Sequence, residues 1–183
     1  MDTPLPKINP EEINIEIINE QYDVTDFQSY EKELVHFLRE DALNNQNQKL
    51  SVTFLWFYQN KLVSYLSLLN DKINLEGTLK EFFQEKDIHY KSLPALKIGR
   101  ICVDERFLKR GLGKLMILTT IKIAQEMNKK RSGCRFITLD AKRNNNPDKD
   151  PLLFYKKMGF QTLREKKNGP TSMYLDLQYT KEA

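Results

Sequence analysis

The sequence contains few of the residues that build disulfide frameworks and metal sites. Its 183 residues include two cysteines, Cys102 and Cys134, and two histidines, without a Cys-x-x-Cys pair. Disulfide-rich scaffolds and structural zinc sites need more such residues at closer spacing. The composition therefore excludes both classes, and we expect a reducing compartment and no bound metal.

The chain also lacks a long apolar run and a strong excess of one charge. No run approaches the roughly 20 residues that span a membrane, and the first residues do not form a signal-peptide pattern. The net charge is only +4, which permits an anionic ligand or RNA without requiring either. We expect a cytoplasmic protein without a membrane segment, folded as a single domain over residues 1–183 with a flexible N-terminal arm at 1–12.

Hydrophobic periodicity predicts a mixed β-sheet with helices on its faces. Strands are expected at 13–18, 51–58, 62–69, 97–103, 136–139, 160–164 and 172–177, and helices at 30–44, 79–85, 111–130 and 151–157. Residues 70–94 show little periodicity, and a connection of that length is often a binding loop. The expected fold class is therefore α/β, of the α+β kind with a mixed sheet.

A basic glycine turn precedes the longest expected helix. Residues 106–115 read Arg-Phe-Leu-Lys-Arg-Gly-Leu-Gly-Lys-Leu, and a helix N-terminus in such a turn can bind an anion through its free N–H groups. It is not a P-loop, because Lys114 is followed by Leu115, nor a Rossmann turn, because Met116 stands at the third glycine position. The turn predicts a site for another phosphorylated cofactor, with an ordinary strand-to-helix turn as the alternative.

Three motifs, in order, resemble those of the GNAT N-acetyltransferase superfamily. Residues 98–104, Ile-Gly-Arg-Ile-Cys-Val-Asp, resemble its central strand, and residues 154–160, Phe-Tyr-Lys-Lys-Met-Gly-Phe, its Phe-Tyr-x-x-x-Gly-Phe signature. Residues 108–113 resemble its cofactor loop, (Gln or Arg)-x-x-Gly-x-(Gly or Ala), except that Leu108 stands at the first position. The likeness spans residues 13–178 and implies a GNAT acyl-CoA N-acyltransferase-like fold, with a central mixed sheet flanked by helices, and acetyl-CoA as cofactor.

The resemblance implies that the strand and the turn bind acetyl-CoA. Backbone groups of the strand would pair with the pantetheine arm, and N–H groups of the turn would hold the pyrophosphate. Basic side chains of the turn could supply the charge that Leu108 lacks. The expected cofactor-binding residues are Ile101, Cys102, Val103, Leu108, Lys109, Arg110, Gly111, Leu112, Gly113 and Lys114.

By the same resemblance, Tyr155 is the general acid. A phenol with a pKa near ~10 is protonated at neutral pH and can donate to the leaving thiolate. The alternative is an aromatic ring packed on the sheet beside Phe154. Asp140, at the end of its strand, is the candidate general base, with Asp104 and Glu105 weaker; for each, the alternative is a capped or solvated carboxylate.

The reaction implied is transfer of the acetyl group from acetyl-CoA to a primary amine of a small molecule or protein, by direct attack. One branch of the superfamily acetylates aminoacyl-tRNA and acts as the toxin of a toxin–antitoxin pair. The chain is similar to that branch in length and in its Ile-Gly-Arg-x-x-Val-Asp strand, and its basic clusters would suit tRNA. The sequence also leaves open a non-catalytic acyl-CoA-binding module and an RNA-binding protein. The resemblance further implies a homodimer, which is common in the family.

Overall fold

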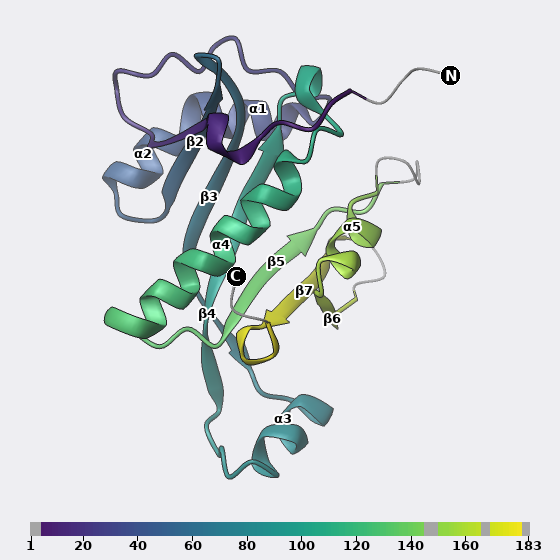
Figure 1. Ribbon diagram of the computed structural model, residues 1–183. Coiled ribbons are helices and arrows are strands. Elements are labelled where there is room, and N and C mark those ends of the chain that lie inside the picture. Colours follow the sequence, from purple (N-terminus) through teal and green to yellow (C-terminus); the bar gives the residue numbers. More distant parts are fainter. Residues whose placement is uncertain (1–4, 145–149, 166–168, 181–183) are drawn as a thin grey trace. The chain divides into compact units, whose positions relative to one another are not determined.

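The computed structural model describes residues 5–144, 150–165 and 169–180 (Figure 1). The chain divides into two compact units, of which unit 1 holds Met1–Leu69 and Ile98–Thr119 and unit 2 holds Asn70–Lys97 and Thr120–Ala183. The single domain over 1–183 and the flexible arm at 1–12 stay predictions.

The strands form a seven-stranded sheet. They are β1 Ile13–Ile17, β2 Val52–Tyr58, β3 Lys61–Asn74, β4 Ser92–Val103, β5 Phe136–Ala141, β6 Gln161–Arg164 and β7 Thr171–Asp176. Their order in the sheet is β1-β2-β3-β4-β5-β7-β6. The expected hairpins are present, because β2 pairs with β3 and β6 with β7, both antiparallel. The expected fold class, a mixed sheet with helices, is confirmed.

In unit 1, two short helices pack on the sheet through an aromatic and aliphatic core. They are α1, Lys32–His36, and α2, Ala42–Asn47, joined by a π-helical turn at Phe37–Asp41. The buried Tyr65 hydroxyl donates to the carbonyl of Leu34 at 2.7 Å, and burial raises the pKa of that phenol. The helix expected over 30–44 is therefore present as an unbroken helical run over 32–47. The sequence did not predict its π-helical stretch, because a π turn changes the hydrogen-bond ladder without changing the apolar periodicity.

In unit 2, the segment expected as a long loop is mostly regular structure. β3 continues to Asn74, helix α3 spans Gly77–Gln84, and β4 begins at Ser92. The reason is a second core, in which the ring of Phe83 packs edge-on against Phe136 with centroids 5.8 Å apart. The helix expected at 79–85 is therefore confirmed as α3, whereas the expectation of a long binding loop over 70–94 is wrong, because β3 and β4 extend into this segment.

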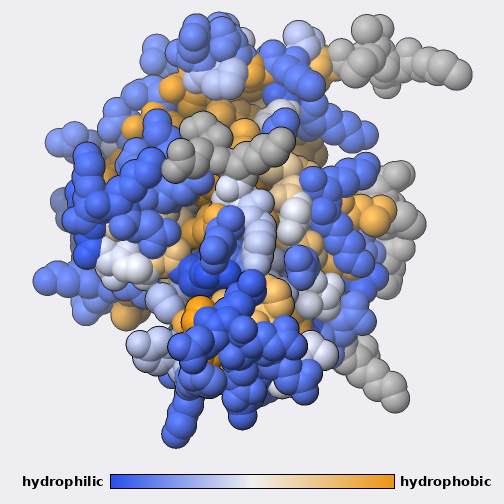
Figure 2. Space-filling model, turned by 60° about the horizontal axis from the view of Figure 1, so that its bottom comes forward, coloured by the Kyte–Doolittle hydropathy of each residue, from blue (hydrophilic) through white to orange (hydrophobic). Residues whose placement is uncertain are grey.

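The long helix α4, Leu112–Lys130, and the short helix α5, Leu152–Lys157, lie where the sequence predicts them. α4 is amphipathic: Leu112, Met116 and Ala124 are buried, while Lys114 and Lys122 are exposed. Among the described residues, no helix is both long and apolar enough to cross a membrane. Figure 2 shows one face of the molecule, where hydrophilic side chains cover most of the surface.

Candidate functional site

The glycine turn has the backbone geometry of an anion cradle. After β4 the chain makes a short 3-10 turn at Glu105–Phe107 and reaches Gly111 at a φ of +91°, a conformation that favours glycine. The N–H of Leu115 donates to the carbonyl of Gly111 at 3.1 Å and closes the first turn of α4. The N–H groups just before it have no carbonyl partner within the helix, so they can bind an anion.

The cations of this turn differ in how freely they can meet a phosphate. Arg110 stacks on the ring of Tyr58 at 5.3 Å, and its Nε donates to the carbonyl of Pro6 at 3.0 Å. Its own carbonyl accepts from the N–H of Ile8 at 3.1 Å. Lys109 and Lys114 are exposed, so they are better placed than Arg110 to supply charge beside the Leu108 position.

The end of β4 offers backbone groups rather than a nucleophile. Ile101 and Val103 are half-buried, and Cys102 is buried. Burial raises the pKa of the Cys102 thiol to about 11, although a hydrogen bond with Ser29 lowers it. The thiol is therefore protonated at neutral pH, so Cys102 is not a nucleophile at this position.

Tyr155 is buried in α5 within a cluster of aromatic rings. Its side chain packs against the ring of Phe154, 5.3 Å away between centroids, and edge-on against Phe160 at 5.8 Å. The residue as a whole is 7% exposed. The packing of Tyr155 is thus compatible both with a role as general acid and with a purely structural ring. A buried phenol can still present its oxygen to a ligand.

The Phe-Tyr-x-x-x-Gly-Phe spacing has a structural cause, a Schellman motif that ends α5. The N–H of Phe160 donates to the carbonyl of Tyr155 at 3.1 Å, and the N–H of Gly159 to that of Lys156 at 3.0 Å. Gly159 takes the left-handed conformation that this motif needs, with a φ of +91°. The contact between Phe160 and Tyr155 is the hydrophobic contact that accompanies the motif, so the signature orients Tyr155.

Asp140 is held by two partners at the end of β5. Lys97 Nζ donates to its Oδ2 at 2.7 Å, and Ser172 Oγ donates to its Oδ1 at 2.6 Å. Ser172 also lines a cavity of about 690 Å³ in unit 2. That cavity is bounded further by Lys72, Glu76, Phe82, Gln161, Arg164 and Tyr174, among others. Asp140 is therefore linked, through Ser172, to a cavity of a size that suits a ligand.

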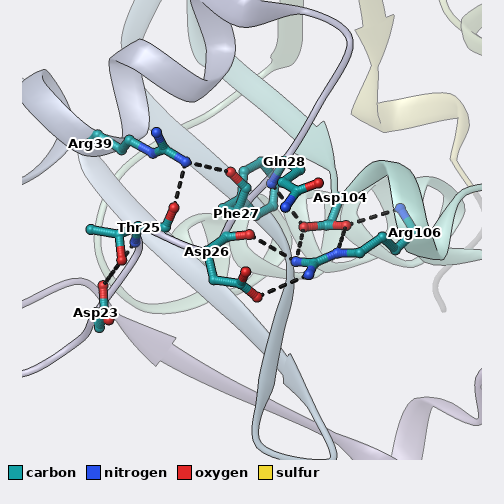
Figure 3. Close-up of polar contacts among 8 residues, drawn as sticks. All are labelled: Asp23, Thr25, Asp26, Phe27, Gln28, Arg39, Asp104 and Arg106. Carbon is teal, nitrogen blue, oxygen red and sulfur yellow. Dashed lines mark hydrogen bonds and ion pairs between the residues drawn. The ribbon is translucent and has the colours of Figure 1, made fainter.

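Asp104 is a buried structural carboxylate. It caps the 3-10 turn by accepting from the N–H of Arg106 at 3.0 Å, and it accepts from Arg106 Nε at 2.8 Å and the N–H of Gln28 at 3.0 Å (Figure 3). Burial alone would raise its pKa, but these hydrogen bonds outweigh burial and hold the pKa below its usual range. The capped alternative is confirmed for Asp104, and a carboxylate engaged in this way is not a general base.

The same cluster contains Asp26, a residue that the sequence analysis did not single out. Arg106 Nη1 donates to Asp26 Oδ2 at 3.0 Å, and Nη2 donates to the Asp26 carbonyl at 2.9 Å. The two residues are 80 positions apart, and no motif marks Asp26. No local sequence pattern could therefore have predicted the contact between Arg106 and Asp26.

The predicted residues fall into two groups. The turn and the end of β4 belong to unit 1, while Tyr155 and Asp140 belong to unit 2. Within the described parts of the chain, no three His, Cys, Asp or Glu side chains gather in a way that could hold a metal ion. Each group is thus built from backbone donors, hydroxyls and single carboxylates.

A family model described as the acetyltransferase (GNAT) domain matches residues 53–162. Among solved structures, AtaT complexed with acetyl-methionyl-tRNAfMet is 18% identical, with a TM-score of 0.74 over 91% of this chain and 95% of that one. A tyrosine-to-phenylalanine mutant of KacT is 19% identical, with a TM-score of 0.74 over 91% and 96%.

AtaTR bound with AcCoA is 18% identical, with a TM-score of 0.73 over 92% and 95%. No curated protein matches the chain. At these identities the solved structures show a common fold, whereas the family model covers more than half of the sequence. The chain therefore belongs to the acetyltransferase (GNAT) family and is an acetyl-CoA-dependent acyltransferase.

Proposed function

We propose that this enzyme acetylates the amino group of an aminoacyl-tRNA. The observation that carries the proposal is the likeness to AtaT in its complex with acetyl-methionyl-tRNAfMet, which covers 91% of this chain and 95% of that one. The likeness spans nearly the whole of both chains, and this extent supports an acceptor of the same class. In this proposal the enzyme acts where aminoacyl-tRNA is found, in the cytoplasm.

Exposed cations in unit 2 support an RNA acceptor. They include Lys129, Lys130 and Arg131 at the end of α4, Lys142 and Arg143 after β5, and Lys156 and Lys157 in α5. Lysine and arginine side chains that neutralise phosphates supply most of the sequence-independent affinity for nucleic acids. These side chains offer local positive charge to an RNA acceptor, although Arg143 is paired with Asp150 at 3.0 Å and the net charge of the chain is only +4.

The cofactor binds, in this proposal, along the end of β4 and on the glycine turn. The backbone of residues 101–103 pairs with the pantetheine arm, and the free N–H groups at the start of α4 bind the pyrophosphate. Lys109 and Lys114 add charge. The Leu108 side chain makes no contact of this kind, so the family's Gln or Arg is replaced in function by these lysines.

The chemical step moves one acetyl group and two protons. The neutral amine attacks the thioester carbonyl, a C–N bond forms and the C–S bond breaks. Tyr155 gives its hydroxyl proton to the departing thiolate. The proton of the attacking amine leaves to Asp140, directly or through water, and the link from Asp140 through Ser172 to the cavity supports that role. Exchange with solvent then returns a proton to Tyr155 and removes the proton from Asp140, so that both groups regain their starting states.

A second candidate function is acetylation of a small-molecule or protein amine. The cavity of about 690 Å³ in unit 2 favours it, because small-molecule sites fall in the range of roughly 300–1,000 Å³. Its lining mixes the aromatic ring of Tyr174 with charged groups such as Glu76 and Lys72. An amine of small size could be received there without any RNA.

The test is transfer of labelled acetyl from acetyl-CoA to aminoacyl-tRNA and, separately, to a panel of free amines. Label in precipitated aminoacyl-tRNA supports the proposal, and label in a free amine alone supports the second candidate. Tyr155→Phe should lower the rate by about 10²–10⁴, the usual contribution of a general acid. Tyr90→Phe is the matched control, because Tyr90 is 72% exposed and lies between α3 and β4. Coenzyme A binding without turnover of any acceptor would overturn both candidates.

We extend the proposal to a toxin with a protein antitoxin. One solved relative is the AtaT toxin bound to the C-terminus of the antitoxin AtaR, with a TM-score of 0.71, and another is the KacTA–DNA complex, with a TM-score of 0.69. Expression of the wild-type enzyme should then arrest growth, and expression of Tyr155→Phe should not. Harmless expression of an enzyme active in the transfer assay would contradict the toxin role. The homodimer also stays a prediction.

A further inference from the structure

Residues 26–28 are bonded to the turn that leads into the cofactor loop (Figure 3). The N–H of Gln28 donates to Asp104 Oδ2 at 3.0 Å, and the N–H of Glu105 donates back to the Gln28 carbonyl at 3.0 Å. Arg106 adds its bonds to the Asp26 carboxylate and carbonyl. Residues 26–28 and 104–106, which are far apart in the sequence, are therefore held in fixed positions relative to each other.

Arg106 is the side chain that joins the parts of this cluster. Its planar guanidinium donates to both oxygens of Asp104, from Nε to Oδ1 and from Nη2 to Oδ2, each at 2.8 Å. Asp104 is fully buried and Asp26 is 78% exposed. The rigid fork of arginine suits such a two-sided contact, which a lysine ammonium reproduces poorly.

The segment that Arg106 holds continues beside the proposed pantetheine strand. Ser29 lies close enough to Cys102 of β4 to lower the pKa of its thiol, and Glu31 close enough to raise that pKa. Glu31 immediately precedes α1. On the other side of the segment, Arg39 donates to the carbonyls of Thr25 and Phe27 (Figure 3).

We propose that Arg106 is a positioning residue that couples the cofactor loop to residues 24–31. The proposal rests on the proposed function, which places coenzyme A on residues 108–114. Coenzyme A bound there fixes the turn at 105–107, and the bonds of Arg106, Asp104 and Gln28 fix residues 26–28 with it. Because coupling is reciprocal, holding this segment in turn favours the cofactor.

Hydrogen–deuterium exchange of the full chain with and without coenzyme A tests this coupling. In the wild type, coenzyme A should slow exchange in peptides that cover 108–116 and also in those that cover 24–31. Arg106→Lys keeps the charge and loses the fork. It should keep slowed exchange at 108–116, lose it at 24–31, and weaken the Kd of coenzyme A about fivefold, the low end of usual allosteric couplings.

Arg39→Lys is the matched control, because it makes the same substitution at another arginine that bonds to this segment, without touching residues 104–106. It should leave the coupling and the Kd unchanged. Equal loss of coupling in both variants would show a general loosening of the segment and would overturn the proposal. Asp26→Ala, at an exposed position that keeps the carbonyl bond, should give a smaller loss in the same direction.

The result for the wild type distinguishes a failure of the proposed coenzyme A site from a failure of the coupling through Arg106. No protection at 108–116 would overturn the placement of coenzyme A under the proposed function. Protection at 108–116 without protection at 24–31 would leave that placement standing and overturn the positioning role of Arg106.

Discussion

Gly159 and Gly111 share a φ of +91° and differ in the space around them. A Cβ on Gly159 would lie 3.2 Å from Leu175 Cδ1, whereas a Cβ on Gly111 would lie no closer than 4.0 Å, from Lys7 Cγ. A left-handed backbone costs an L-residue about 1–2 kcal/mol, and overpacking of a core adds about 1–3 kcal/mol. Gly111→Ala should therefore lower the free energy of unfolding by about 1–2 kcal/mol, and Gly159→Ala by about 2–5 kcal/mol.

Urea unfolding followed by circular dichroism measures these costs, and thermal melts check them at about 2–4 °C per kcal/mol for a chain of this size. Gly133→Ala is the control, because a Cβ there meets open space and its φ lies outside the left-handed region. That variant should be neutral or gain about 0.4–1 kcal/mol, since alanine restricts the unfolded chain.

The steric share at Gly159 can be separated with Leu175→Val, which shortens the opposing side chain. The double variant Gly159→Ala with Leu175→Val should be more stable than the two single costs predict by about 1 kcal/mol, a typical coupling for residues in contact. Equal costs at Gly111 and Gly159, together with strict additivity of the double variant, would refute the reasoning.

Three further outcomes follow from the structure. Asp104→Asn should destabilise the protein at pH 7 by about 1–3 kcal/mol. Folding lowers the pKa of Asp104. The stabilisation by its carboxylate is therefore fully present above the unfolded pKa near ~4 and is lost as the pH falls through the folded pKa. The difference in urea midpoint from the wild type should thus shrink on acidification, and a constant difference would contradict this account. Cys102 and Cys134 should resist a thiol reagent in the folded protein and both react in urea, because both are buried and burial raises the pKa of each thiol. Lys130→Glu should lower kcat/KM for aminoacyl-tRNA and flatten its salt dependence while sparing coenzyme A binding, as measured by initial rates at several salt concentrations.

The glycine turn before α4 could be predicted because its determinants are contiguous. The two glycines, the flanking basic residues and the start of an apolar helix all fall within residues 106–115, so one local pattern predicts one local geometry. The same holds for residues 154–160, where the spacing of Tyr155, Gly159 and Phe160 is that of a Schellman motif.

Features that depend on distant contacts could not be predicted. β3 continues past the polar residue Asp71 because Thr138 donates to the Asp71 carboxylate at 2.6 Å, a bond between residues 67 positions apart. The Arg106–Asp26 contact likewise joins residues that lie far apart in the sequence, 80 positions from each other. Propensity and periodicity carry no information on such pairs, since tertiary packing decides which polar residues enter a strand or a cluster.

The contact between Arg110 and Pro6 sets an order of events during synthesis. The two residues are 104 positions apart, so at about 5–20 residues per second the segment around Pro6 waits about 5–20 s before its partner has been made. The turn before α4 and the segment at 6–8 can therefore form their mutual contacts only after residue 110 has been made. Until then the N-terminal segment lacks the partner that it has in the folded chain.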